Sequence, residues 1–345
     1  MLPQILPKER FDEFVERLLA ERRVVGPVAK GPQFAFGEID SPEQLRMDYN
    51  TTIQSPKKYF FPPYETLLNF EGGKASAPDL SAATATAILG MHPCDIYATW
   101  LLDDVFRSDN ADPYYIARRD RALIIGLECF RPCDEQQFCS DMGTLSVKAG
   151  YDLLLTDLGD RYFVEVGTPA GKSLVAACQL FTASNPQDLS EKQTFDTQKY
   201  ANFVKRIPYD VKYLPELLNA SYDSLIWDAV ARKCFSCGSC NLTCPTCYCF
   251  DVNDNLNANV QGGQRQRSWD GCQLKSFAAV AGGENFREHR ASRLRHRMFR
   301  KGKYMLEAFG KMGCVGCGRC IRVCVAKISI LETFQQIAGE VTAEK

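Results

Sequence analysis

The sequence predicts an α+β protein in which a mixed α/β domain (residues 1–222) is followed by a mainly helical ferredoxin-like domain (residues 223–345). Three observations support this. Strand-like patterns lie in the first part, eleven of the sixteen cysteines lie beyond residue 230, and the charge changes sign between the parts. Residues 1–224 hold 23 Lys+Arg against 32 Asp+Glu, a net charge of −9, whereas residues 225–345 hold 18 against 10, a net charge of +8.

The composition is that of a folded protein with a buried core. Of the 345 residues, 45% are hydrophobic and 24% are charged, which excludes a disordered chain. No apolar stretch reaches the roughly eighteen residues that a membrane helix needs, so we expect no membrane span. Pro3, Pro7 and early charges interrupt the apolar segment that a signal peptide needs, and we therefore expect a cytoplasmic protein.

The first part carries helix and strand signals. Residues 50–65, rich in prolines and aromatic residues, predict an ordered loop that lines a surface. Two apolar runs, residues 84–89 and 122–127, predict buried strands, and residues 151–156 and 162–166 predict a β-hairpin. Near the start, five apolar residues recur at helical spacing and predict a core-facing helix: Phe11, Phe14, Val15, Leu18 and Leu19.

Each of the two predicted strands leads into a cysteine-bearing segment. The first runs into Cys94, and the second into Cys129, with Cys133 and Cys139 shortly after. If the two strands are parallel neighbours, their carboxyl ends bring Cys94 close to Cys129. That edge is where open α/β sheets tend to bind ligands.

Beyond residue 200 the pattern becomes helical and rich in loops. Between Cys244 and Cys314 lie a helix-like run, Leu274–Val280, and a basic run, Arg287–Lys303. We therefore expect a helical dicluster domain rather than a compact β-rich ferredoxin. The basic run predicts a docking or cluster-shielding surface, and because no nucleic-acid-binding motif accompanies it, we expect no nucleic-acid partner.

The strongest signal is a cysteine spacing, Cys-x2-Cys-x2-Cys-x3-Cys, that occurs twice. In this spacing three close thiolates hold three corners of a [4Fe-4S] cube, and the fourth cysteine ligates the other cube. Zinc is the alternative, but it usually takes two separated pairs of ligands, and two triplet-plus-one runs do not divide that way. We predict two [4Fe-4S] clusters, one on Cys234, Cys237, Cys240 and Cys324, the other on Cys314, Cys317, Cys320 and Cys244.

Eight cysteines lie outside these runs. Cys178 lies in an apolar helical run and is expected to be a small buried hydrophobe. The other seven cysteines form two sets. The first set is Cys94, Cys129, Cys133 and Cys139, which could hold a third [4Fe-4S] cluster or could be free or structural thiols. The second set is Cys247, Cys249 and Cys272, which could instead join Cys94 or Cys129 across the domain interface.

The chain also resembles a known family over nearly its whole length. The family comprises the iron-sulfur beta subunits of cytoplasmic sulfhydrogenases and NAD(P)-linked nickel-iron hydrogenases, and the 4Fe-4S dicluster chain of anaerobic sulfite reductase is a relative. In the second part the resemblance rests on four segments: residues 234–249 (Cys-x2-Cys-x2-Cys-x3-Cys-Pro-Thr-Cys-x-Cys), Arg267–Cys272, Gly282–Arg287 and Cys314–Cys320. In the first part it rests on Pro56–Phe61, His92–Tyr97, Tyr114–Tyr115 with Arg118–Arg119, and Phe138–Cys139.

The resemblance implies an electron-transfer subunit of a soluble multi-subunit oxidoreductase in anaerobic metabolism. Such a subunit passes electrons between a flavin subunit that uses NAD(P)H and a catalytic subunit, foremost a nickel-iron hydrogenase. The same relay in a sulfite reductase or a heterodisulfide reductase-linked complex is the alternative, and a non-redox assembly or sensing module with structural clusters is a further one. The sequence predicts no catalytic residue. Flavin binding by the first domain is a third alternative.

Overall fold

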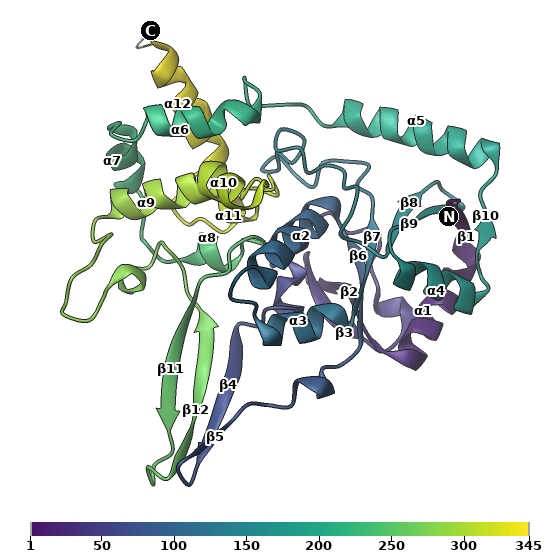
Figure 1. Cartoon of the computed structure of the whole chain (residues 1–345). Helices are drawn as coiled ribbons and strands as arrows, with labels where there is room; N and C mark the ends of the chain where they lie inside the picture. The colour runs from purple at the N-terminus through teal and green to yellow at the C-terminus, as the bar shows by residue number, and fades with distance from the viewer. Residues whose placement is uncertain (1, 344–345) are drawn as a thin grey trace.

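The computed structural model describes residues 2–343 and is built around an eight-stranded mixed sheet (Figure 1). The strand order is β10-β1-β9-β8-β7-β6-β2-β3. The central strands β2, β6, β7 and β8 are parallel neighbours, and the pairs toward both edges are antiparallel. The bounds are β1 Gln4–Pro7, β2 Arg23–Lys30, β3 Gln33–Ile39, β6 Thr86–Met91, β7 Ala122–Leu127, β8 Leu153–Asp157, β9 Arg161–Val166 and β10 Thr182–Ala183.

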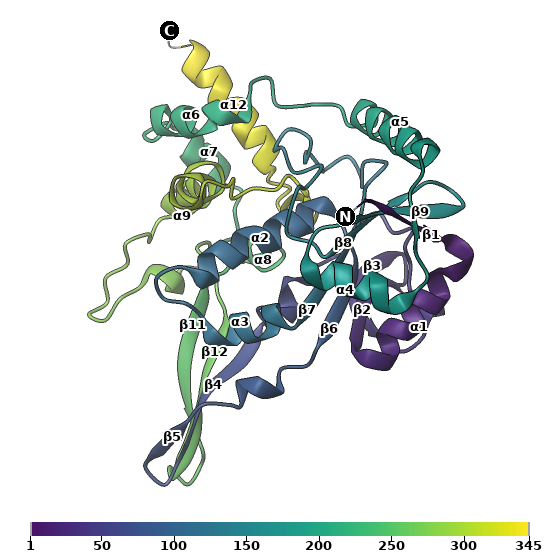
Figure 2. The same ribbon diagram turned by 45° about the vertical axis from the view of Figure 1, so that its right-hand side comes forward.

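Helices cover both faces of this sheet, as Figure 2 shows. On one face α1 and α4 bury Phe14 and Leu174 against the strands, and Cys178 lies in the same core, as its apolar run predicted. On the other face α2 and α3 bury Ile96 and Tyr115. These helices span α1 Phe11–Glu21, α2 Pro93–Arg107, α3 Pro113–Asp120 and α4 Pro169–Cys178.

The predicted elements of the first part are present. The first apolar stripe forms α1, the two apolar runs form the parallel neighbours β6 and β7, and the hairpin is β8–β9. The predicted loop at residues 50–65 holds a 3-10 turn, Pro56–Tyr59, before β4 begins at Tyr64. The α+β class that the sequence predicts is therefore confirmed.

The second part is mainly helical and has its own core. Trp227, Met298 and Phe334 pack together there, and Phe138, from the loop after β7, joins them. α9 continues through a π-helical turn, Arg300–Tyr304, into α10. The helices are α5 Pro186–Asn202, α6 Leu214–Ala220, α7 Ile226–Ala231, α8 Ser239–Leu242, α9 Arg290–Phe299, α10 Met305–Phe309, α11 Arg319–Arg322 and α12 Ile330–Ala343.

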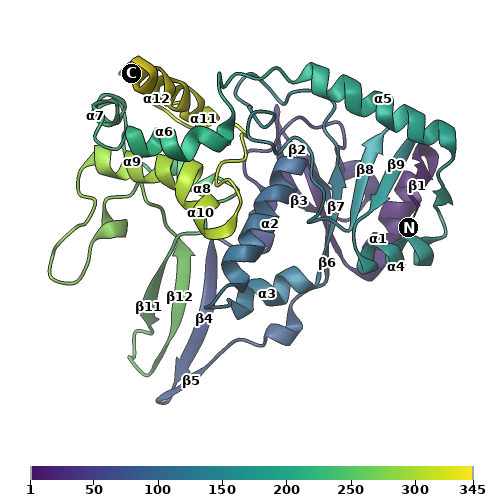
Figure 3. The ribbon, with the colours of Figure 1, turned by 45° about the horizontal axis from the view of Figure 1, so that its top comes forward.

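A second sheet forms an arm that projects from the body (Figure 3). Its strands run antiparallel in the order β11-β12-β4-β5, so a segment before the predicted boundary at residue 222 pairs with one after it. The bounds are β4 Tyr64–Glu71, β5 Lys74–Ser76, β11 Phe250–Leu256 and β12 Gly262–Trp269.

The segment between the cysteine runs contains two strands that were not predicted, and one of its expected helices was wrong. The strands β11 and β12 were missed because every residue of β11 is exposed, so no buried alternating face marks it in the sequence. The run Leu274–Val280 contains only a single 3-10 turn, Ser276–Ala278, where Ala278 is buried and Val280 is exposed. The basic run does form a helix, α9.

Candidate metal centres

Both cysteine runs fold in the same way. Each passes through two left-handed residues and then enters a one-turn helix. In the first run these residues are Ser236 (φ 53°) and Gly238 (φ 74°), before α8, and in the second they are Gly316 (φ 65°) and Gly318 (φ 72°), before α11. Glycine adopts this conformation at no steric cost, which explains three of the four residues. The turns curl each run around its own thiols.

Backbone N–H groups point at sulfur in these turns. The amide of Ser236 donates to Cys234 Sγ at 3.3 Å, and the amide of Gly316 donates to Cys314 Sγ at 3.5 Å. After the second run, the amide of Ile328 donates to Cys324 Sγ at 3.3 Å. Hydrogen bonds of this kind stabilise thiolate ligands and tune the potential of an iron-sulfur cluster.

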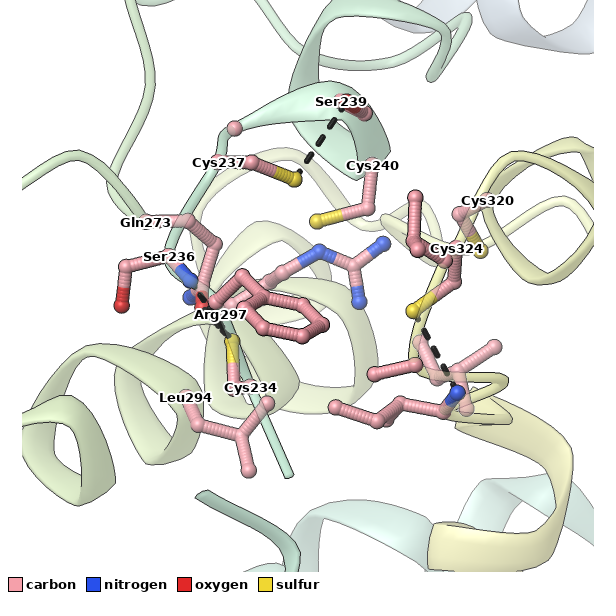
Figure 4. A pocket seen from close by; sticks show the side chains of 16 residues that line it. Cys234, Ser236, Cys237, Ser239, Cys240, Gln273, Leu294, Arg297, Cys320 and Cys324 are labelled. Atoms are coloured by element: carbon pink, nitrogen blue, oxygen red, sulfur yellow. Dashed lines mark hydrogen bonds between the residues drawn. The ribbon is translucent and has the colours of Figure 1, made fainter. Parts of the chain in front are cut away.

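The eight thiols of the two runs surround two adjacent cavities. Figure 4 shows the first cavity, where sulfur atoms approach from both runs. Cys320 lines both cavities, so the two sites share a wall. The first is lined by Cys234, Cys237, Cys240, Cys320 and Cys324, and the second by Cys244, Cys314, Cys317 and Cys320. Each cavity thus contains one of the two sets that the crossing rule pairs.

The number of thiols at each cavity suits a cluster. At least four cysteines line each one, and each iron of a [4Fe-4S] cube takes one cysteine.

Burial raises the pKa of three of these thiols and so keeps them protonated in the absence of metal. It raises the pKa of Cys240 to about 12 and that of Cys317 to about 11, and it raises the pKa of Cys314 further. Two other thiols have a lowered pKa. The hydroxyl of Ser239, 3.4 Å from the sulfur of exposed Cys237, lowers the pKa of that thiol, and a hydrogen bond with Cys247 lowers the pKa of buried Cys244. Iron must therefore displace protons from Cys240, Cys314 and Cys317 when it binds.

The structure brings Cys94, Cys129, Cys133 and Cys139 together beside the second cavity. Cys94 lies in the first turn of α2, and the other three lie in the loop after β7. Burial raises the pKa of Cys133 to about 11 and that of Cys139 to about 12, and nearby thiolate charge, from Cys133 and then Cys317, raises that of Cys139 further. Cys139 is buried and the other three are half-buried, and Cys94 and Cys139 lie close enough to Cys317 of the second run for their charges to interact.

The loop that carries these cysteines packs directly on the second run. The amide of Phe138 donates to Gly316 O at 2.7 Å. A Cβ at Gly316 would lie 2.5 Å from Phe138 O, and one at Gly318 would lie 2.6 Å from Gln136 O. Only glycine permits this approach of two backbones.

Cys247, Cys249 and Cys272 lie around Cys244. The side-chain amide of Asn241 donates to Cys272 Sγ at 3.5 Å and to Cys247 Sγ at 3.8 Å. A hydrogen bond between the thiols of Cys244 and Cys247 raises the pKa of Cys247.

Three buried cations surround the same cysteines. Lys57, Arg297 and Lys301 are 3–4% exposed, and none forms an ion pair with a carboxylate of the described residues. Lys57 Nζ donates to the carbonyls of Cys244 and Cys247, each at 2.8 Å, and Lys301 Nζ donates to Thr246 Oγ1 at 2.6 Å. A buried cation without a counter-ion is costly, and thiolate-ligated cubes are the anions that this donor set would hold.

Sequence reasoning missed this charge arrangement. Lys57 belongs to the surface-loop prediction, and Arg297 and Lys301 belong to the run that was expected to dock or shield. The spacing of Arg297 and Lys301 is the signal that could have identified them. Positions four apart lie on one face of a helix, and here that face is buried.

A buried ion pair joins the two parts of the chain at the second run. Arg319, in α11, donates from Nη1 and Nη2 to the two carboxylate oxygens of Asp95 at 2.6 and 2.7 Å. It also donates to the backbone and side-chain oxygens of Thr52, each at 3.0 Å. Both charged side chains are at most 3% exposed.

Comparison with known proteins bears on these centres. The model of the 4Fe-4S dicluster domain family matches residues 233–328. The sulfhydrogenase 2 subunit beta of Pyrococcus furiosus is 34% identical over 333 residues, which cover 96% of this chain and 97% of that protein. No solved structure matches the chain. Among residues 2–343, no helix combines the length and apolar character needed to cross a bilayer.

Proposed function

Since the chain belongs to the family of sulfhydrogenase beta subunits, we propose that it relays electrons within a soluble multi-subunit hydrogenase of the cytoplasm. In this proposal the two cavities hold one [4Fe-4S] cluster each, on the two crossed sets of four cysteines. Bound clusters of this kind supply one-electron redox chemistry. The partners are a flavin subunit that uses NAD(P)H and a nickel-iron catalytic subunit.

The observation that carries the proposal is the adjacency of the thiol groups. The first and second cavities share Cys320, and Cys317 of the second cavity adjoins Cys94 and Cys139. Redox centres held at these places would follow one another through the protein. At one end of the row Cys237 is exposed, which suits exchange of electrons with a partner subunit.

The test is reduction of the chain's clusters inside the intact complex. After anaerobic isolation with its partners, NAD(P)H or hydrogen should reduce the clusters, as followed by electron paramagnetic resonance. Clusters that stay oxidised under these reductants, and that only dithionite reduces, would contradict the relay and favour the assembly or sensing module. A sirohaem or heterodisulfide reductase-like partner, in place of a hydrogenase, would move the relay to the alternative complexes.

A third cluster is proposed on Cys94, Cys129, Cys133 and Cys139, because these four thiols lie close enough for their charges to interact with one another and with Cys317. The chain would then hold about twelve irons, against about eight for two cubes. The competing set is Cys247, Cys249 and Cys272 around Cys244.

Two double variants distinguish these sets by iron content. Replacing Cys129 and Cys139 by serine should remove about four irons and leave the others. Replacing Cys249 and Cys272 by serine is the matched control and should leave the iron content unchanged. The opposite outcome would place the third cluster beside Cys244, and about eight irons in the unaltered chain would contradict a third cluster altogether.

A further inference from the structure

Arg297, in α9, occupies the wall between the two cluster cavities. Its side chain lines the first cavity together with Cys240 and the second together with Cys244. Figure 4 shows the guanidinium among the sulfur atoms of Cys240 and Cys324. The residue is 4% exposed, so water does not screen its charge.

This guanidinium has no partner among the described residues of the protein. Its Nε is buried without a hydrogen bond, and no side-chain hydrogen bond or ion pair joins Arg297 to the rest of residues 2–343. Arg293, one turn earlier in the same helix, shows what a structural arginine looks like here. Its guanidinium donates to Gln273 O at 3.1 Å, to Ser236 Oγ at 3.0 Å, and to the carbonyls of Arg287 and Glu288.

A buried arginine without protein partners is costly unless an anion completes the site. The groups that face Arg297 are cysteines from both runs, which line the two cavities with it. A purely structural role would require bonds of the kind that Arg293 makes. The unsatisfied charge is therefore directed at the occupants of the two cavities.

We propose that Arg297 is a positioning residue whose charge is shared by both clusters and raises the reduction potential of each. The inference rests on the proposed clusters but not on the proposed relay. Reduction makes a cluster one charge more negative, and a neighbouring positive charge stabilises that state. Because one side chain serves both cavities, its loss should affect both clusters, whereas a residue that lines one cavity would affect one.

The test compares R297Q with R297K and with R295Q in potentiometric titrations followed by electron paramagnetic resonance. R297Q should lower the reduction equilibrium constant of both cubes about tenfold or more, which for one electron is about 59 mV. R297K keeps the charge and should recover most of the shift. R295Q removes the same charge from the helix face that contacts Tyr222, and should leave both potentials unchanged.

Unshifted potentials in R297Q with full iron content, or a shift in one cube only, would overturn the proposal. If R297Q fails to assemble its clusters, the proposal is tested on the unaltered protein instead. Arginine labelled with 15N at the guanidinium should give a nitrogen coupling in the spectra of both reduced cubes, and its absence would contradict the proposal. The titration uses mediators and dithionite and does not depend on NAD(P)H. Failure of NAD(P)H to reduce the clusters would therefore contradict the relay but not the proposed role of Arg297.

Discussion

The buried pair Asp95–Arg319 offers the sharpest test of how the two parts of the chain hold together. Asp95→Asn keeps the shape of the side chain but removes the charge that Arg319 contacts at 2.6 and 2.7 Å. Arg319 would keep its two bonds to Thr52 and lose its counter-ion at 3% exposure. Removing one partner of such a buried pair costs about 3–5 kcal/mol.

Hydrogen exchange measures this cost without requiring reversible unfolding of a metalloprotein. Amides in the peptides that carry Asp95 and Arg319 should exchange about a hundredfold faster or more in the variant, since every 1.4 kcal/mol is roughly tenfold. The matched control is Asp254→Asn, which breaks an exposed bidentate pair with Arg265, with contacts of 2.7 Å. Water screens that pair, so exchange should change little. Equal effects of the two variants would refute the reasoning.

Three further predictions follow from the site. In the metal-free protein Cys237 should react with iodoacetamide much faster than Cys240, whose pKa burial raises to about 12; equal labelling by mass spectrometry would contradict this. Iron binding during reconstitution should strengthen as pH rises, because protonated thiols must lose protons to bind; a pH-independent titration would show that the thiols are already ionised. Gly316→Ala should lower the thermal unfolding temperature far more than Gly310→Ala. The two glycines have nearly the same φ, 65° and 64°, but only at Gly316 does a backbone oxygen lie within 4 Å of the added Cβ. Equal decreases in unfolding temperature would mean that φ alone determines the cost.

Sequence spacing predicts the metal chemistry well because it is local. Three closely spaced cysteines, with glycine between the second and third positions of the motif, form the same turn in both runs, as Gly238 and Gly318 show. The apolar runs that became β6 and β7 were legible for the same reason, since a buried strand needs only its own residues to be apolar.

What the sequence could not predict depends on contacts between distant segments. Lys57 lies 187 residues from Cys244, whose carbonyl it contacts, and the pairing of β4 with β12 crosses a similar distance. The strand β11 is exposed along its whole length and so carries no hydrophobic pattern. The boundary at residue 222 stays a prediction, although Phe138 packs in the core of the second part.

The claim on which the account depends most is that the two cysteine runs hold two cubes. Mössbauer spectroscopy of the anaerobically isolated, iron-57-enriched chain, combined with iron, sulfide and zinc analysis, tests it most directly. Two cubes require [4Fe-4S] spectra with at least about eight irons and as many sulfides per chain, and no stoichiometric zinc. Zinc in place of iron, or fewer than about eight irons bound as cubes, would contradict the claim.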